Sequence, residues 1–89
     1  MQILDYVLKM TCGACPEQYD VFDSDGKQVG YLRLRHGGFR ADYPDCGGDT
    51  VYCYSFDDAW KGMFDNEERE FFLTEAVKAI HSHERRQNA

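Results

Sequence analysis

The pattern of apolar and polar positions changes along the chain, from a period of two before residue 57 to a helical period after residue 65. Between residues 18 and 56, short runs alternate in the way typical of strands with one buried face. Between residues 66 and 83, apolar residues recur at helical spacing. We therefore expect a single domain over residues 1–89 with an α+β fold: an antiparallel sheet of about four to five strands, packed by one C-terminal helix.

Two turns divide residues 19–44 into a β-meander. Asp25-Gly26 is a strong hairpin signal because both residue types tolerate positive φ, and Gly37-Gly38 after His36 marks the second turn. The predicted strands cover residues 18–23, 28–36, 39–43 and 51–56. Residues 2–10 favour a further strand, with a short helix as the alternative.

Alternation within the strands and the helix indicates which side chains face the core. Leu32 and Leu34 lie opposite Tyr31, Arg33 and Arg35 on one strand, so the leucine face is predicted to be buried and the other face at least partly solvated. In the helix, the apolar stripe consists of Phe72, Leu73, Ala76, Val77 and Ile80.

Two further features indicate where the helix begins and which residues cover one end of the core. Asp65 with Glu68 three positions later is a capping-box pattern, which predicts that the helix begins at residue 66. In the connector over residues 57–64, Trp60, Met63 and Phe64 are expected to cover one end of the core.

The net charge of −6 is concentrated in the second half of the chain, because eleven of the 16 acidic residues follow residue 40. This balance disfavours nonspecific binding to nucleic acids or anionic membranes, both of which need a basic surface. We expect no direct nucleic-acid binding and no membrane association. The opposite role, an acidic surface that faces a basic groove, fits the charge.

The N-terminal residues lack a basic start followed by an apolar stretch, so no targeting segment is predicted. No apolar run approaches the ~18 residues that a membrane helix needs. The expected compartment is therefore the reducing cytoplasm, where cysteines serve as metal ligands or thiols more often than as disulfides.

The four cysteines form two pairs, Cys12 with Cys15 before the meander and Cys46 with Cys53 after it. If the folded meander brings the pairs together, four thiolates could hold one tetrahedral zinc ion. Such a site has no open position for water, so it would be structural. It would also add the free energy of metal binding to that of a core limited by the short chain. The alternatives are cysteines buried in a small core and a redox-active C-x2-C pair.

No set of nucleophile, base and acid is apparent, so we do not expect an enzyme. Tyr31, Arg33, Arg35 and Arg40 could form a patch that binds a nucleotide or nucleic acid, because arginine and aromatic side chains suit phosphates and bases. The simpler interpretation of this face is ion pairing with Asp20 and Asp42 on a solvated sheet surface.

The stretch from Cys15 to Gly48, CPEQYDVFDSDGKQVGYLRLRHGGFRADYPDCGG, resembles small proteins of bacteriophages and prophages. Within that group, the whole chain resembles a zinc-containing type II-A anti-CRISPR protein. This resemblance implies a phage-encoded inhibitor of host Cas9 in the bacterial cytosol. Cas9 holds nucleic acid in a positively charged channel, which a compact acidic protein could occupy.

From the resemblance and the charge we expect stoichiometric inhibition of target-DNA binding, without catalysis. The candidate contact residues are acidic ones in the second half of the chain: Asp57, Asp58, Asp65, Glu67, Glu68 and Glu70. Trp60 and Phe64 are candidate anchors, although a place in the core explains them equally well. The alternative function is a nucleotide- or nucleic-acid-binding module, such as a sponge for a signalling nucleotide, that uses the Tyr31/Arg33/Arg35/Arg40 face.

Overall fold

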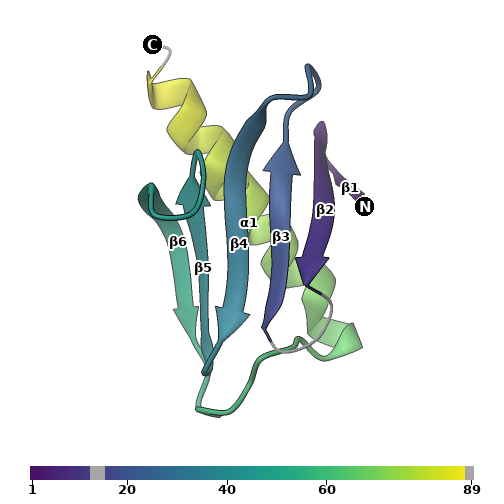
Figure 1. Ribbon diagram of the computed structural model, residues 1–89, viewed down its shortest axis with the longest axis vertical. Helices are drawn as coiled ribbons and strands as arrows, with labels where there is room; N and C mark the ends of the chain where they lie inside the picture. The colour runs from purple at the N-terminus through teal and green to yellow at the C-terminus, as the bar shows by residue number, and fades with distance from the viewer. Residues whose placement is uncertain (13–15, 88–89) are drawn as a thin grey trace.

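The computed structural model describes residues 1–12 and 16–87 and confirms the α+β fold, with strands of one antiparallel sheet packed by one C-terminal helix (Figure 1). Neighbouring strands in the sheet are also neighbours in the sequence. The described elements are β1 (Gln2–Ile3), β2 (Tyr6–Cys12), β3 (Glu17–Phe22), β4 (Gln28–Arg35), β5 (Gly38–Tyr43), β6 (Asp49–Ser55) and α1 (Asn66–Gln87).

The described strands number six, so the prediction of about four to five was too low. The additional strand comes from the N-terminal segment, which folds back on itself instead of forming one strand over residues 2–10. Leu4 takes a left-handed φ of 55°, and the turn pairs Ile3 with Tyr6. Leucine rarely adopts this conformation, so the sequence carries no turn signal here.

Both turns of the predicted meander are present, one of them shifted by a residue. At the first, Gly26 has a φ of 83°, and the Asp23 carboxylate accepts hydrogen bonds from the backbone N–H groups of Asp25 and Lys27. The second turn consists of His36 and Gly37, with φ values of 51° and 77°, instead of Gly37 and Gly38. A Cβ atom on Gly37 would lie 2.4 Å from the backbone oxygen of Asp58, so this glycine also permits the close approach of a later segment.

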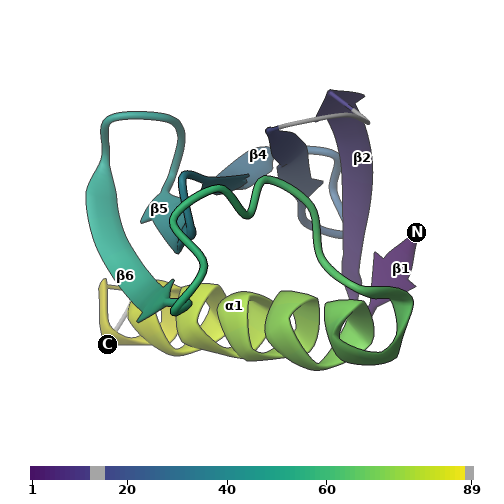
Figure 2. The same cartoon turned by 90° about the horizontal axis from the view of Figure 1, so that it is seen from below.

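The helix α1 lies across one face of the sheet, behind it in Figure 1 and below it in Figure 2. The predicted apolar stripe, Phe72 to Ile80, is the buried face of this helix. Leu32 and Leu34 are fully buried beneath it, whereas Arg35 on the opposite face is exposed, as the alternation predicted. The Glu68 carboxylate accepts a hydrogen bond from the Asp65 N–H at 2.9 Å, which is one of the two bonds of the predicted capping box, and the helix begins at Asn66 as predicted. The helix continues to Gln87, past the predicted end at residue 83.

Candidate protein-binding surface

Residues 56–65 connect β6 to α1 and run across one end of the sheet, at the bottom of Figure 1 and in the foreground of Figure 2. The side chains of this connector differ in how far they are exposed to solvent. Phe64 is buried, stacked on Phe72 with ring centroids 5.5 Å apart and against the edge of Phe39 at 4.9 Å. Trp60 is 86% exposed and Met63 44% exposed. The expectation that all three cover the core is therefore wrong for Trp60 and Met63.

The backbone of the connector is held by hydrogen bonds on both sides of Trp60. Before Trp60, the Phe56 N–H donates to the Gly37 carbonyl at 2.7 Å. After it, the Lys61 carbonyl accepts from the Gly37 N–H and the Gly62 carbonyl accepts from the Glu17 N–H, both at 2.8 Å. The N–H of Trp60 itself donates to the Asp58 carboxylate at 2.9 Å. The indole is therefore displayed to solvent from a backbone that is fixed to β3 and to the β4–β5 turn.

Glu17 is the residue that ties the connector, the sheet and the helix together, and sequence reasoning did not single it out. Its carboxylate is fully buried and accepts hydrogen bonds from Arg69 Nε at 2.8 Å and from the Phe64 N–H at 3.0 Å. The Tyr19 hydroxyl also donates to it. Burial would raise the pKa of Glu17, but these bonds together lower it below its usual value.

The six acidic residues predicted to contact a partner lie at this same end of the molecule, in two groups. Asp57 and Asp58 belong to the connector, beside the β4–β5 turn. Asp65, Glu67, Glu68 and Glu70 lie at the start of α1. Trp60 lies between the two groups in the sequence.

Lys61 neutralises part of the second group. Its ammonium lies 2.7 Å from the Glu68 carboxylate and 3.6 Å from that of Asp65. The hydrogen bond from Lys61 lowers the pKa of Glu68, and the same bond raises the pKa of Lys61. Within the described residues, the remaining four carboxylates form no ion pair: Asp57, Asp58, Glu67 and Glu70.

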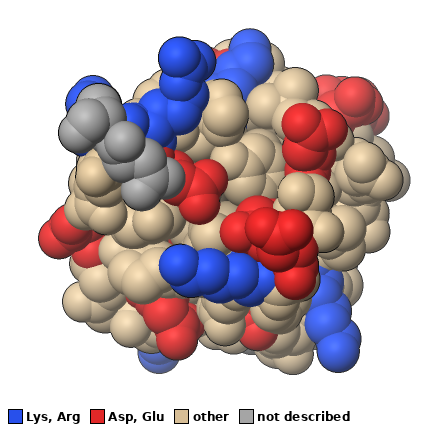
Figure 3. Space-filling view, turned by 90° about the horizontal axis from the view of Figure 1, so that it is seen from above, with Lys and Arg blue, Asp and Glu red and all other residues tan. Residues whose placement is uncertain are grey.

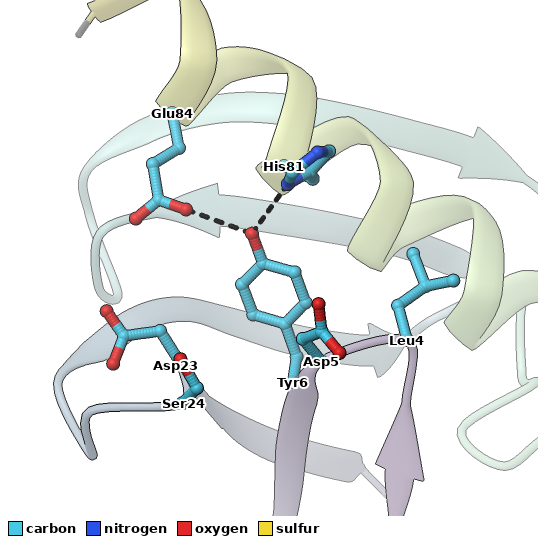
Figure 4. A pocket seen from close by; sticks show the side chains of 7 residues that line it. All are labelled: Leu4, Asp5, Tyr6, Asp23, Ser24, His81 and Glu84. Atoms are coloured by element: carbon cyan, nitrogen blue, oxygen red, sulfur yellow. Dashed lines mark hydrogen bonds between the residues drawn. The ribbon is translucent and has the colours of Figure 1, made fainter.

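The opposite end of the molecule has a mixed charge. In Figure 3, which looks down on that end, acidic and basic side chains are interspersed. A surface pocket of about 410 Å³ there is lined in part by Asp5, Asp23 and Glu84. Figure 4 shows how the Tyr6 hydroxyl in this pocket donates to the Glu84 carboxylate at 2.9 Å and meets His81 Nδ1 at 2.9 Å. These contacts fasten β2 to the last turns of α1.

The Tyr6 hydroxyl is suited to this structural role. Burial, followed by the bond to Glu84, raises the pKa of Tyr6 well above its ordinary value of 10.0. A raised pKa means that the protonated phenol, the form that donates the hydrogen bond to Glu84, is favoured in the folded state.

The described cysteines do not converge as the zinc prediction requires. Cys12 ends β2 and Cys53 lies in β6, and one row of paired residues joins them: Cys12, Gln18, Arg33, Arg40 and Cys53. Strands are spaced about 4.8 Å apart, so four spacings separate Cys12 and Cys53 by roughly 19 Å along the sheet. Sulfur ligands of one zinc ion lie only about 4 Å from each other.

Cys46 has no paired residue in β6. The last residue pair before the β5–β6 turn is Tyr43 with Asp49. Cys46 lies within that turn and is exposed. Cys15 lies outside the described residues. Residues 1–12 and 16–87 contain no group of three or more metal-binding side chains. The cysteines described here do not fit one tetrahedral centre, and zinc binding by the chain stays a prediction.

Tyr31 and the three arginines Arg33, Arg35 and Arg40 were expected on a solvated face, and they do share the face of the sheet that is turned away from α1. Of the expected ion pairs with Asp20 and Asp42, one is present: Arg40 Nε lies 3.3 Å from the Asp42 carboxylate. Asp20 accepts a hydrogen bond from Gln28 instead.

Comparison with models of protein families, with curated proteins and with solved structures finds no match for this chain. No helix in the described part of the chain combines the length and the apolar character needed to cross a lipid bilayer.

Proposed function

We propose that this protein is a stoichiometric inhibitor that binds the basic, nucleic-acid-binding groove of a partner protein through the surface around Trp60. The single observation that supports this most directly is the exposure of Trp60, at 86%, on a connector whose backbone is hydrogen-bonded on both sides. An exposed tryptophan on a backbone that is already fixed needs no ordering of that backbone on binding, and tryptophan is a frequent hot-spot residue of interfaces.

The charge around Trp60 indicates the kind of partner. Asp57 and Asp58 precede the tryptophan closely, and Glu67 and Glu70 follow at the start of α1, all without ion pairs among the described residues. Carboxylates that form no ion pair within their own protein attract lysine and arginine side chains on a partner. A groove that ordinarily holds nucleic acid carries such side chains, so the inhibitor and the nucleic acid would compete for them.

The resemblance of the chain to a type II-A anti-CRISPR protein suggests which partner to test first. Cas9 of a phage host binds its target DNA in a positively charged channel. The proposed function is therefore inhibition of target-DNA binding by Cas9 in the bacterial cytosol, by a protein of phage origin. The mechanism needs only occupancy of the channel at a ratio of one to one, and no chemical step.

The proposal is tested by mixing the purified protein with a guide-loaded Cas9 and measuring co-elution on a sizing column and loss of target-DNA binding. Trp60→Ala should weaken the complex by about 30-fold or more, which corresponds to ~2 kcal/mol for a hot-spot residue. The matched control is Val7→Ala, because Val7 is also exposed, at 46%, but lies on β2 away from the connector. Equal affinity of the Trp60 variant and the parent would contradict the proposed surface.

Charge is tested separately. The pair Asp57→Asn and Asp58→Asn should weaken binding and reduce its dependence on salt concentration, because two attractive charges are removed. The pair Asp5→Asn and Asp25→Asn removes the same charge near the opposite end of the molecule and should leave binding unchanged. If both pairs weaken binding equally, only the net charge matters and the connector is not the contact surface. If neither guide-loaded nor free Cas9 binds the parent protein, Cas9 is not the partner.

A further inference from the structure

Three arginines gather on the face of the sheet turned away from α1, near the bottom of Figure 1, where β4 and β5 meet at their turn. Arg33 pairs directly with Arg40 across the two strands, and Arg35 lies two residues farther along β4. Like charges in directly opposite positions of a sheet repel each other and destabilise the pairing. The fold therefore places three cations close together, and two of them, Arg33 and Arg40, repel each other.

Few acidic groups neutralise these cations. Arg40 has one carboxylate partner, Asp42, at 3.3 Å. Asp42 is itself buried and also accepts hydrogen bonds from the Thr50 hydroxyl and the Gly47 N–H. Within the described residues, neither Arg33 nor Arg35 forms an ion pair. The Nε atom of Arg40 is buried and forms no hydrogen bond within the described residues, so its contact with Asp42 is an ion pair without a hydrogen bond.

The same arginines line a hollow of about 360 Å³, together with Gly38 and Ser55. The strand register explains the hollow, because Gly38 lies between Arg35 on β4 and Ser55 on β6 in one row across the sheet. The missing side chain of Gly38 leaves a gap in that row. Guanidinium groups and a serine hydroxyl are all hydrogen-bond donors, so the hollow offers donors and positive charge to a ligand.

We propose that this hollow binds the phosphate group of a small phosphorylated molecule such as a mononucleotide. Guanidinium groups bind phosphate oxygens through paired, charge-assisted hydrogen bonds. A bound dianion would also relieve the repulsion between Arg33 and Arg40. A long nucleic acid fits less well, because the chain as a whole carries a charge of −6 and Asp57 and Asp58 lie beside the β4–β5 turn.

The proposal is tested by nuclear magnetic resonance titration of isotope-labelled protein with inorganic phosphate, with adenosine monophosphate and with a single-stranded oligonucleotide, each at constant ionic strength. Phosphate and the mononucleotide should shift the backbone resonances of Gly38 and Ser55 and the side-chain Nε–H resonances of Arg33 and Arg40. Both should also raise the melting temperature, because a ligand of the folded state stabilises it. Failure of phosphate and of the mononucleotide to shift these resonances at millimolar concentrations would overturn the proposal.

A variant with Arg33→Gln and Arg35→Gln should lose both the shifts and the ligand-induced rise in melting temperature. The matched control carries Arg85→Gln and Arg86→Gln in the last turn of α1, which removes the same charge elsewhere and should bind like the parent. Without ligand, Arg33→Gln alone should raise the melting temperature at low salt, because it removes the repulsion. Tighter binding of the oligonucleotide than of the mononucleotide, or equal loss of binding in the two double variants, would contradict a specific small-molecule site.

Discussion

Glu17 on β3 and Arg69 on α1 form a buried ion pair, with Arg69 Nε 2.8 Å and Nη2 3.1 Å from the Glu17 carboxylate oxygens. The Glu17 side chain has no exposed surface. Arg69 also donates to the Phe64 carbonyl at 2.9 Å, and the Phe64 N–H donates to Glu17. The pair therefore fixes the end of the connector that carries Trp60, and the candidate binding surface depends on a contact that lies beneath it.

Glu17→Gln should lower the free energy of unfolding by about 3–5 kcal/mol, the usual cost of breaking a buried ion pair from one side. The change leaves the Arg69 guanidinium without its carboxylate in a site that is mostly shielded from water. Urea unfolding followed by circular dichroism measures the effect. Glu70→Gln, an exposed glutamate in the first turns of the same helix, is the control and should change the free energy by less than ~0.5 kcal/mol. Similar stabilities of the two variants would mean that the ion pair contributes nothing.

The stability of the protein should fall as the pH is lowered below the ordinary glutamate pKa of 4.5. Hydrogen bonds from Arg69, Tyr19 and Phe64 lower the pKa of Glu17 in the folded state, so the folded state resists protonation more strongly than the unfolded state does. The stabilisation is thus complete above the unfolded pKa and is lost as the pH falls through the folded pKa. Free energies of unfolding at pH 6 and pH 3 should differ less in Glu17→Gln than in the parent. An equal difference would assign the pH dependence to other carboxylates.

The parts of the fold that local patterns encode were predictable from the sequence. The stripe from Phe72 to Ile80 and the alternation around Leu32 and Leu34 each indicate a buried face without reference to the rest of the chain. The turn at Leu4 was missed because a left-handed leucine carries no glycine or asparagine signal. Its conformation is imposed by pairing between Ile3 and Tyr6, which only the folded sheet reveals.

The candidate site was less accessible to sequence reasoning. A signal for Glu17 was present, because it alternates with Tyr19 and Val21 and therefore shares their inward face. The predicted strand of residues 18–23 leaves Glu17 outside, and a charged residue beside a strand is normally exposed to solvent. The exposure of Trp60 could not be predicted from the neighbouring sequence, since an aromatic residue in a connector with other apolar residues fits the core equally well. Likewise, convergence of the cysteines depends on strand order, which places β2 and β6 toward opposite edges of the sheet.

Gly30 on β4 lies directly beneath Ile80 of the helix, and the close packing there predicts a specific pair of substitutions. A Cβ atom on Gly30 would lie 2.4 Å from the Cδ1 atom of Ile80 and 3.2 Å from the Cβ atom of Val21. Gly30→Ala should therefore lower the free energy of unfolding by about 1–3 kcal/mol through overpacking. Ile80→Val removes the clashing Cδ1 atom. The double variant should be more stable than Gly30→Ala alone, which thermal unfolding of all four proteins measures.

This double-mutant cycle separates the clash from other effects of alanine on the strand. Ile80→Val alone should cost about 0.5–1.5 kcal/mol because it leaves a small cavity. If the two changes act through contact, their combined effect will be smaller than the total of the separate effects. Simple additivity would show that the helix shifts to accommodate the methyl group and that Gly30 does not set the distance between α1 and β4.

Cys46→Ser distinguishes the arrangement of cysteines seen here from the four-thiolate zinc site. Cys46 is exposed in the β5–β6 turn, so its replacement by serine should change the free energy of unfolding by no more than ~0.5 kcal/mol. Thermal unfolding with and without a zinc chelator, together with elemental analysis of the purified protein, provides the measurement. Cys53→Ser is the companion variant, because Cys53 is also exposed and lies in β6. The opposite result would be about one zinc per chain, together with a large loss of stability in both variants and in the parent protein when the chelator is added. Metal binding would then be part of the folding free energy, and the cysteines would have to converge in solution.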